Sequence, residues 1–287
     1  MVNYGGLSGE YTGFDSSAIV ILPVPFDDGS STWIKRADKG PEAILEASAN
    51  MELYDIETGC EVFKEGVFTA PLLQKHTIAQ EMFADVYKNV GNYLTKGKFV
   101  VTIGGTHSVS IGAAKAYVEK YPNLTVLHLG AHSNLRPEFG GMSYNQSCTM
   151  NRIKEYAPIV QVGIRSMDKI EVPYMDKNRV FFATDIMRDK DWMNEVLELL
   201  TENVYLTINL DVFDPGIMPS TGKPEPGGLL WYDVIDLLKM VIDTSKLVGF
   251  DVVELCPNPE NKAPDFLASK LIYQLISYKF AKKPKKK

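Results

Sequence analysis

The stretch from residue 124 to residue 134 reads LTVLHLGAHSN, an apolar run that passes into polar residues. Its apolar part, residues 124–129, has the length of a buried strand, and the polar part begins with a glycine. Strands rich in Val, Ile and Leu are typical of parallel sheets, because helices cover both faces of such a sheet. The stretch therefore predicts a parallel strand followed by a loop that carries His132.

Similar runs recur along the chain, with stretches of helical spacing between them. The expected strands span residues 18–23, 99–103, 124–129, 159–164, 180–183, 204–210 and 247–255. The expected helices span residues 77–94, 110–120, 191–201, 232–243 and 263–280. This alternation predicts a doubly wound α/β fold with helices on both faces of a mainly parallel sheet. No composition break divides the chain, so we expect a single domain over residues 1–287 with a Lys-rich tail at 280–287.

Composition excludes several classes of protein. The formal charge of −6 at pH 7 argues against a nucleic-acid surface, which needs a basic face. Cys60, Cys148 and Cys256 are odd in number and far apart, which indicates neither a disulfide framework nor an oxidising compartment. No apolar run approaches the roughly 20 residues of a membrane span, and the N-terminus does not resemble a signal peptide. We therefore expect a cytoplasmic protein with no nucleic-acid or membrane partner.

Polar side chains follow four of the expected strands. His107 follows the second strand, His132 the third, Asp211 the sixth, and Glu254 lies at the end of the seventh. In open parallel sheets, functional residues collect beyond the carboxyl ends of the strands. Two histidines and two carboxylates are therefore expected to converge at one edge of the sheet.

These segments resemble the ureohydrolases, the arginase/agmatinase family, and most closely its agmatinase branch. The likeness also includes PSTGKPEPGG at residues 219–228, DVVELCP at residues 251–257 and GIRS at residues 163–166. It begins at residue 23 and ends near Tyr278, so it spans nearly the whole chain. The resemblance implies a three-layer α/β/α arginase-like fold with a mainly parallel sheet. It also implies assembly into trimers or hexamers and hydrolysis of a guanidino compound to an amine and urea.

The resemblance further implies a pair of Mn²⁺ ions that hold the attacking hydroxide, and such a pair needs bridging carboxylates to offset the repulsion between the ions. Three of the family's metal-ligand positions are retained, as His107, His132 and Asp211. At three others the family has aspartate, whereas this chain has Gly130, Asn134 and Asn209. Because Gly130 and Asn209 fall at the two bridging positions, we expect no stoichiometric pair of metal ions.

Two further site residues follow from the resemblance. Gln146, in YNQSC at residues 144–148, replaces a family histidine that handles protons, and glutamine cannot act as an acid near neutral pH. Glu254 is retained at the position that receives the substrate guanidinium in the family. We therefore take Glu254 as the substrate-binding residue and Gln146 as a lost catalytic group.

Three hypotheses for function follow. The first is an agmatinase-like ureohydrolase homologue with a degraded dinuclear manganese site and impaired catalysis. Such a chain would serve as a regulatory or structural subunit, in a homo-oligomer or beside an active paralogue. The second is an active metal-dependent agmatinase or amidinohydrolase whose altered manganese site uses His132, Asp211, waters and one further ligand. The third is a protein that binds a guanidinium or polyamine ligand through Glu254 without chemistry. Metal content separates the second hypothesis from the other two.

Overall fold

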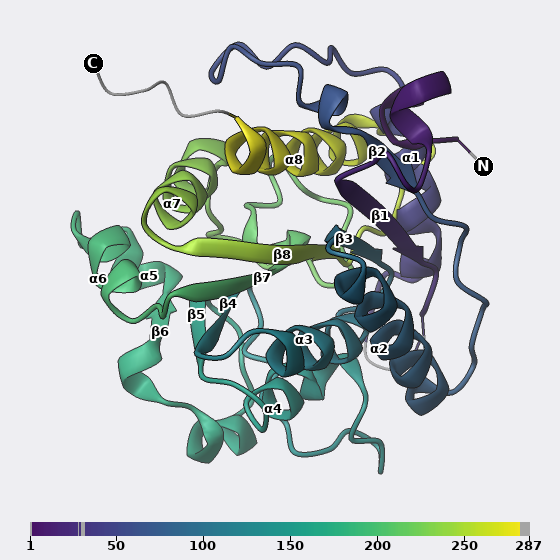
Figure 1. The fold of residues 1–287 in the computed structure, drawn as a ribbon. Helices are drawn as coiled ribbons and strands as arrows, with labels where there is room; N and C mark the ends of the chain where they lie inside the picture. Colours follow the sequence, from purple (N-terminus) through teal and green to yellow (C-terminus); the bar gives the residue numbers. More distant parts are fainter. Residues whose placement is uncertain (1, 28, 30–31, 282–287) are drawn as a thin grey trace.

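A parallel sheet of eight strands forms the centre of the molecule (Figure 1). The computed structural model describes residues 2–27, 29 and 32–281, so the expected Lys-rich tail lies outside the described residues from residue 282 onward. The strand order is β2-β1-β3-β8-β7-β4-β5-β6, and every neighbouring pair is parallel. The strands are β1 (Ile19–Val24), β2 (Val67–Thr69), β3 (Phe99–Gly104), β4 (Leu124–Leu129), β5 (Ile159–Ile164), β6 (Val180–Phe182), β7 (Asn203–Asn209) and β8 (Lys246–Val253).

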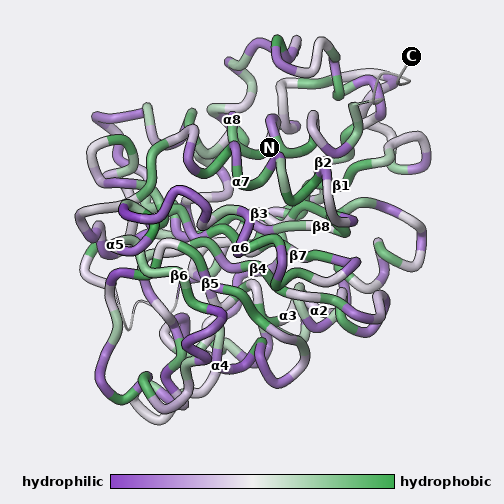
Figure 2. The backbone as a smooth tube through the Cα atoms, turned by 90° about the vertical axis from the view of Figure 1, so that its left-hand side faces the viewer, coloured by the Kyte–Doolittle hydropathy of each residue, from purple (hydrophilic) through white to green (hydrophobic). Residues whose placement is uncertain are grey.

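Helices cover both faces of this sheet. One face carries α1 (Gly40–Ser48), α7 (Trp231–Thr244) and α8 (Ala263–Phe280), and the other carries α2 (Ala79–Thr95), α3 (Val109–Lys120) and α4 (Thr149–Ile153) (Figure 1). The short helices α5 (Ala183–Ile186) and α6 (Trp192–Glu198) lie near β6. Each face is sealed by its own cluster of buried apolar side chains, and the strands form the hydrophobic centre of the molecule (Figure 2). The three-layer α/β/α prediction is therefore confirmed. In the described part of the chain, no helix is long and apolar enough to span a bilayer.

Most predicted elements are present with ends within a few residues of the expectation. The strand expected over residues 247–255 is too long, because β8 stops at Val253 and Glu254 takes a left-handed backbone conformation with φ 72°. The sequence did not predict β2 or the helices α1, α4 and α5. β2 has three residues, which is too short for any periodic pattern. Pro41 lies in the first turn of α1, where its missing N–H costs no helical hydrogen bond.

A row of polar side chains crosses the sheet on the face covered by α2 and α3. Gln161 of β5 is registered with His128 of β4, and His128 with Thr207 of β7. Thr207 is in turn registered with Asp251 of β8, and Asp251 with Thr102 of β3. All five side chains are buried. We call these five residues the polar row; it lies one pleat below the carboxyl ends of the strands.

Candidate active site

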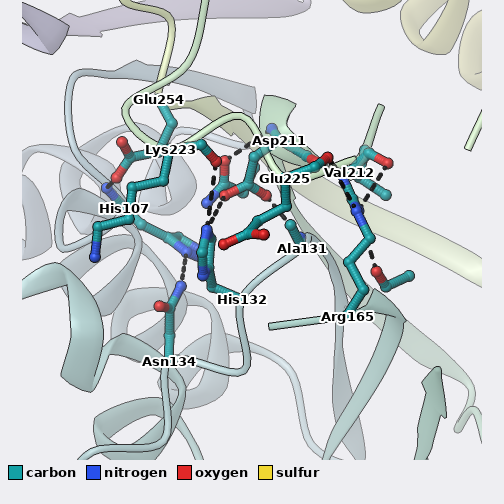
Figure 3. Close-up of polar contacts among 12 residues, drawn as sticks. His107, Ala131, His132, Asn134, Arg165, Asp211, Val212, Lys223, Glu225 and Glu254 are labelled. Carbon is teal, nitrogen blue, oxygen red and sulfur yellow. Dashed lines mark hydrogen bonds and ion pairs between the residues drawn. The ribbon is translucent and has the colours of Figure 1, made fainter. Parts of the chain in front are cut away.

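The residues predicted from the strand ends do meet at one edge of the sheet. His107 follows β3, His132 follows β4, Asp211 follows β7 and Glu254 follows β8 (Figure 3). His107, Asp211 and Glu254 are buried, and the side chain of His132 is 18% exposed. The parallel direction of the four strands brings these side chains together.

His107 is fully enclosed by hydrogen-bonding groups. Its Nε2 lies 3.0 Å from Oγ1 of Thr207, and its Nδ1 lies 2.9 Å from Nδ2 of Asn134. Its backbone N–H donates to Oε1 of Glu254 at 2.8 Å. Burial, and to a smaller extent the nearby charge of His132, lowers the pKa of His107 to about 3, so its ring is neutral at physiological pH. Both ring nitrogens are therefore engaged inside the protein.

His132 and Asp211 form the second half of the site. Nε2 of His132 lies 3.9 Å from Oδ2 of Asp211 and 3.4 Å from the carbonyl oxygen of Lys223 (Figure 3). Oδ1 of Asp211 accepts a hydrogen bond from the backbone N–H of Ala131 at 2.7 Å. Burial raises the pKa of Asp211, and the charge of His132 opposes that shift. Asp211 thus has one oxygen committed to the backbone and the other turned toward His132.

Of the three replaced positions, Asn134 and Asn209 carry amide side chains and Gly130 carries no side chain. Asn134 covers Nδ1 of His107. Oδ1 of Asn209 accepts the backbone N–H of Asp211 at 3.1 Å and so caps the short turn Leu210–Val212. Gly130 and Asn209 directly follow the last registered pair of β4 and β7. The two residues at the family's bridging positions are therefore neighbours, and neither carries a charge.

The ring of His128 occupies the space beside Gly130. A Cβ atom placed on Gly130 would lie 2.5 Å from Nε2 of His128 and 3.4 Å from Oδ1 of Asp211. The His128 ring is held from the other side by Gln161, whose Nε2 lies 3.0 Å from its Nδ1, and it packs on His107 with ring centroids 4.9 Å apart. Nε2 of His128 has no hydrogen-bond partner among the described residues. A buried imidazole therefore fills the place that a side chain at residue 130 would need.

A cleft opens over this site. Gln146, Ser147, Lys223 and Glu254 line it, together with Thr32, His132, Asn134, Asn209 and Asp211. Oε1 of Gln146 is buried and has no partner among the described residues. A neighbouring, more open depression shares His132, Asn134 and Lys223 and adds Arg136, Asp168, Glu171 and Glu225. The two depressions adjoin each other through these shared residues, and we call them together the channel.

The loops around the cleft are fixed by Arg165 and Asp214. Nη2 of Arg165 donates to the carbonyl oxygens of Asp211 at 2.7 Å and Glu225 at 2.8 Å (Figure 3). The Asp214 carboxylate accepts the backbone N–H groups of Gly216, Gly227 and Gly228 at 2.8, 3.0 and 3.1 Å, which holds the PEPGG turn against the end of β7. These hydrogen bonds hold the backbone from residue 211 to residue 228 in a fixed arrangement beside the cleft.

These side chains do not fit a pair of divalent ions. Two dications roughly 4 Å apart repel strongly, and bridging carboxylates must offset that repulsion. Of the three retained and three replaced ligand positions, only Asp211 supplies a carboxylate, and the Nδ1 of His107 is covered by an amide N–H group. In the part of the chain that the structure describes, no three His, Cys, Asp or Glu side chains are grouped to hold an ion. The expectation of no stoichiometric metal pair stays a prediction.

Sequence reasoning missed the residues beneath the site. His128, Thr207 and Asp251 lie inside the expected strands, where they read as ordinary strand residues between apolar neighbours. A histidine and an aspartate within otherwise apolar runs were the available signal, because such groups are seldom fully buried without a partner.

Comparisons with known proteins agree with the fold and with the sequence motifs. The pattern of the Arginase family matches residues 17–277. The N(1)-aminopropylagmatine ureohydrolase of Synechocystis sp. is 34% identical over 278 residues, covering 93% of this chain and 90% of that protein. The protein of the same name from Thermus thermophilus is 36% identical over 272 residues, covering 93% and 92%. The agmatine ureohydrolase structure of Thermoplasma volcanium superimposes with a TM-score of 0.84 at 27% identity, covering 93% and 92%.

The contact between Gly130 and His128 makes the two positions energetically coupled. We expect Gly130→Ala to lower the free energy of unfolding by about 1–3 kcal/mol, because the new methyl group overlaps the His128 ring. In a His128→Ala background the same change is expected to cost clearly less. Urea denaturation of the wild type, both single variants and the double variant measures this coupling. Strictly additive effects would contradict the steric account.

Burial of His128 also predicts how stability depends on pH. Desolvation, followed by the charges of His107 and His132, holds the pKa of His128 well below its usual 6.5. Below pH 6.5 the unfolded chain binds a proton at this residue and the folded chain does not, so stability falls as the pH falls. Between pH 7 and pH 5, His128 alone is expected to lower the free energy of unfolding by about 2 kcal/mol. The free energy of unfolding of a His128→Gln variant should fall by that much less over the same pH range. A pH profile of stability unchanged from the wild type would count against a neutral buried His128.

Proposed function

Because the chain belongs to the arginase family, on its agmatinase branch, we propose that it is a ureohydrolase homologue that has lost hydrolysis by a manganese pair. One observation carries this proposal. Amide side chains at two of the ligand positions are bonded within the protein: Nδ2 of Asn134 lies on Nδ1 of His107, and Oδ1 of Asn209 accepts the backbone N–H of Asp211. Of the six ligand positions only Asp211 supplies a carboxylate, which is too little negative charge to offset the repulsion between two dications.

Proton handling supports the same proposal. Glutamine has no titratable group, so Gln146 cannot protonate a leaving amine near neutral pH. Glu254, by contrast, is held in place by the His107 backbone N–H and lines the cleft. The chain thus retains the group that would receive a guanidinium and lacks a group that would complete the reaction.

Such a chain would serve as a regulatory or structural subunit, in a homo-oligomer or beside an active paralogue. The segment Lys169–Tyr174 supports an interface, because it exposes Ile170, Val172 and Tyr174 to 51%, 42% and 39%. Asp168 and Glu171 of the same region line the open depression, so a subunit docked here would reach the channel. Apolar side chains exposed together are typical of interaction surfaces.

A second candidate is hydrolysis by an altered metal site around His132 and Asp211. The observation in its favour is that His132 and Asp211 lie 3.9 Å apart and both line the cleft. A single ion held there would need further ligands, and the neighbouring Asn209 offers only an amide. Binding of a guanidinium or polyamine ligand at Glu254 without chemistry is the third, still open, hypothesis.

The proposal predicts that chelator-treated protein takes up no stoichiometric Mn²⁺ in a calorimetric titration. Urea release from agmatine is expected to equal the protein-free background, with or without added Mn²⁺, because neither a metal pair nor a replacement acid is present. A Glu254→Gln variant is the matched control, since it removes the negative charge that a guanidinium would face and keeps an oxygen that can accept the His107 backbone N–H. Urea release that scales with protein concentration and disappears in this control would favour the second candidate.

The subunit proposal predicts that the purified chain forms a trimer or hexamer in light scattering at micromolar concentration. Ile170→Asp with Val172→Asp is expected to shift the protein toward the monomer, because the charges would be buried in the interface. Ile56→Asp, at a side chain that is 88% exposed and far along the chain from this segment, serves as the control. A wild-type monomer under these conditions would contradict homo-oligomerisation.

A further inference from the structure

The polar row contains a chain of hydrogen bonds that leads to His107. The Asp251 carboxylate accepts the hydroxyl protons of Tyr205 and Thr207 at 2.6 and 2.8 Å, and Ser110 and the backbone N–H of Ile208 also hydrogen-bond to it. Thr207 Oγ1 then lies 3.0 Å from Nε2 of His107. Asp251, Thr207 and His107 are all fully buried, so water does not compete for these bonds.

The protons available along this series of hydrogen bonds determine which ring nitrogen of His107 carries the hydrogen. An ionised carboxylate only accepts hydrogen bonds, so the single hydroxyl proton of Thr207 is used on Asp251. Ser110, 3.1 Å from Thr207 Oγ1, is an alternative acceptor for the same proton. In either arrangement Thr207 has no proton left for His107, and it must accept one from Nε2.

The other ring nitrogen then has a defined role. The buried imidazole of His107, whose ring nitrogens face Thr207 and Asn134 and no carboxylate, is neutral and carries one proton, so the proton on Nε2 leaves Nδ1 bare. A bare nitrogen accepts a hydrogen bond, which requires the NH₂ group of Asn134, and not its oxygen, to face His107 at 2.9 Å. The orientation of the Asn134 amide therefore follows from Asp251, two hydrogen bonds away from His107.

We infer that Asp251 is a positioning residue that acts through Thr207 to hold His107 as the Nε2–H tautomer, with its Nδ1 lone pair directed at Asn134 beside the cleft. This role follows from the register of β7 with β8, which places Thr207 directly beside Asp251. It does not depend on whether the chain hydrolyses any substrate. Partners of this kind fix the tautomer and orientation of histidines in many functional sites.

Asp251→Asn is the informative change, because it replaces one of the two accepting carboxylate oxygens with an NH₂ group, which only donates hydrogen bonds. Tyr205 keeps an acceptor if the new oxygen faces it, and the new NH₂ group then donates to Thr207. Thr207 becomes free to donate to Nε2 of His107. The ring proton is therefore expected to move to Nδ1, and the amide of Asn134 to turn over.

The experiment is a long-range ¹H–¹⁵N correlation spectrum of ¹⁵N-labelled protein at pH 7.5, in which the shifts of the two ring nitrogens report the tautomer. His107 is identified by the loss of its signals in His107→Gln. We expect the Nε2–H pattern in the wild type, the inverted pattern in Asp251→Asn, and the wild-type pattern in Thr207→Ser, which keeps the hydroxyl. A purely structural role of Asp251 would not invert the two nitrogen shifts.

Thr207→Val provides a second measurement if Asp251→Asn does not fold. It removes the acceptor for the Nε2 proton, so Nδ1–H is expected to become populated. An Nδ1–H pattern in the wild type would overturn the inference. A wild-type pattern in both Asp251→Asn and Thr207→Val would also overturn it, and would assign control of the tautomer to Asn134.

Discussion

The parallel register of β4, β7 and β8 is the constraint on which the site depends. It places His128, Thr207 and Asp251 side by side in one row. Because side chains two residues apart share a face of a sheet, the next positions along β4 and β7 are Gly130 and Asn209. The polar row and the residues at the base of the cleft therefore form two successive layers of side chains. The size of the side chain at residue 130 or 209 decides how much space and which hydrogen bonds the polar row beneath it has.

Two neutral amides, Asn134 and Asn209, stand at positions where the resemblance to the family implies metal-binding carboxylates. Asn134 donates to a nitrogen whose lone pair would otherwise face the cleft, and Asn209 caps the turn that holds Asp211. Neutral amides make these hydrogen bonds without adding negative charge beside the buried Asp211. Lys223 lines the cleft beside Asp211 and Glu254, and adds positive charge to a region that would otherwise carry two carboxylates.

Much of this arrangement could be predicted from sequence, because it depends on local pattern and on position relative to strand ends. The apolar runs located seven of the eight strands, and the polar residues after them located His107, His132, Asp211 and Glu254. The direction of the His128 ring could not be predicted, since it depends on the empty space at Gly130, on Gln161 of the next strand and on His107 from a distant loop. The tautomer of His107 likewise needs the distances among three separate segments.

Overlap between residue 130 and the His128 ring also bears on the history of the chain. On the proposed loss of the metal site, a return from Gly130 to aspartate would meet the His128 ring, which Gln161 already holds. The reverse step then requires either a second change or passage through a less stable protein. Marginal stability makes such intermediates vulnerable to selection. On that proposal the packing would act as an evolutionary ratchet, in which the loss of one carboxylate is harder to undo than it was to acquire.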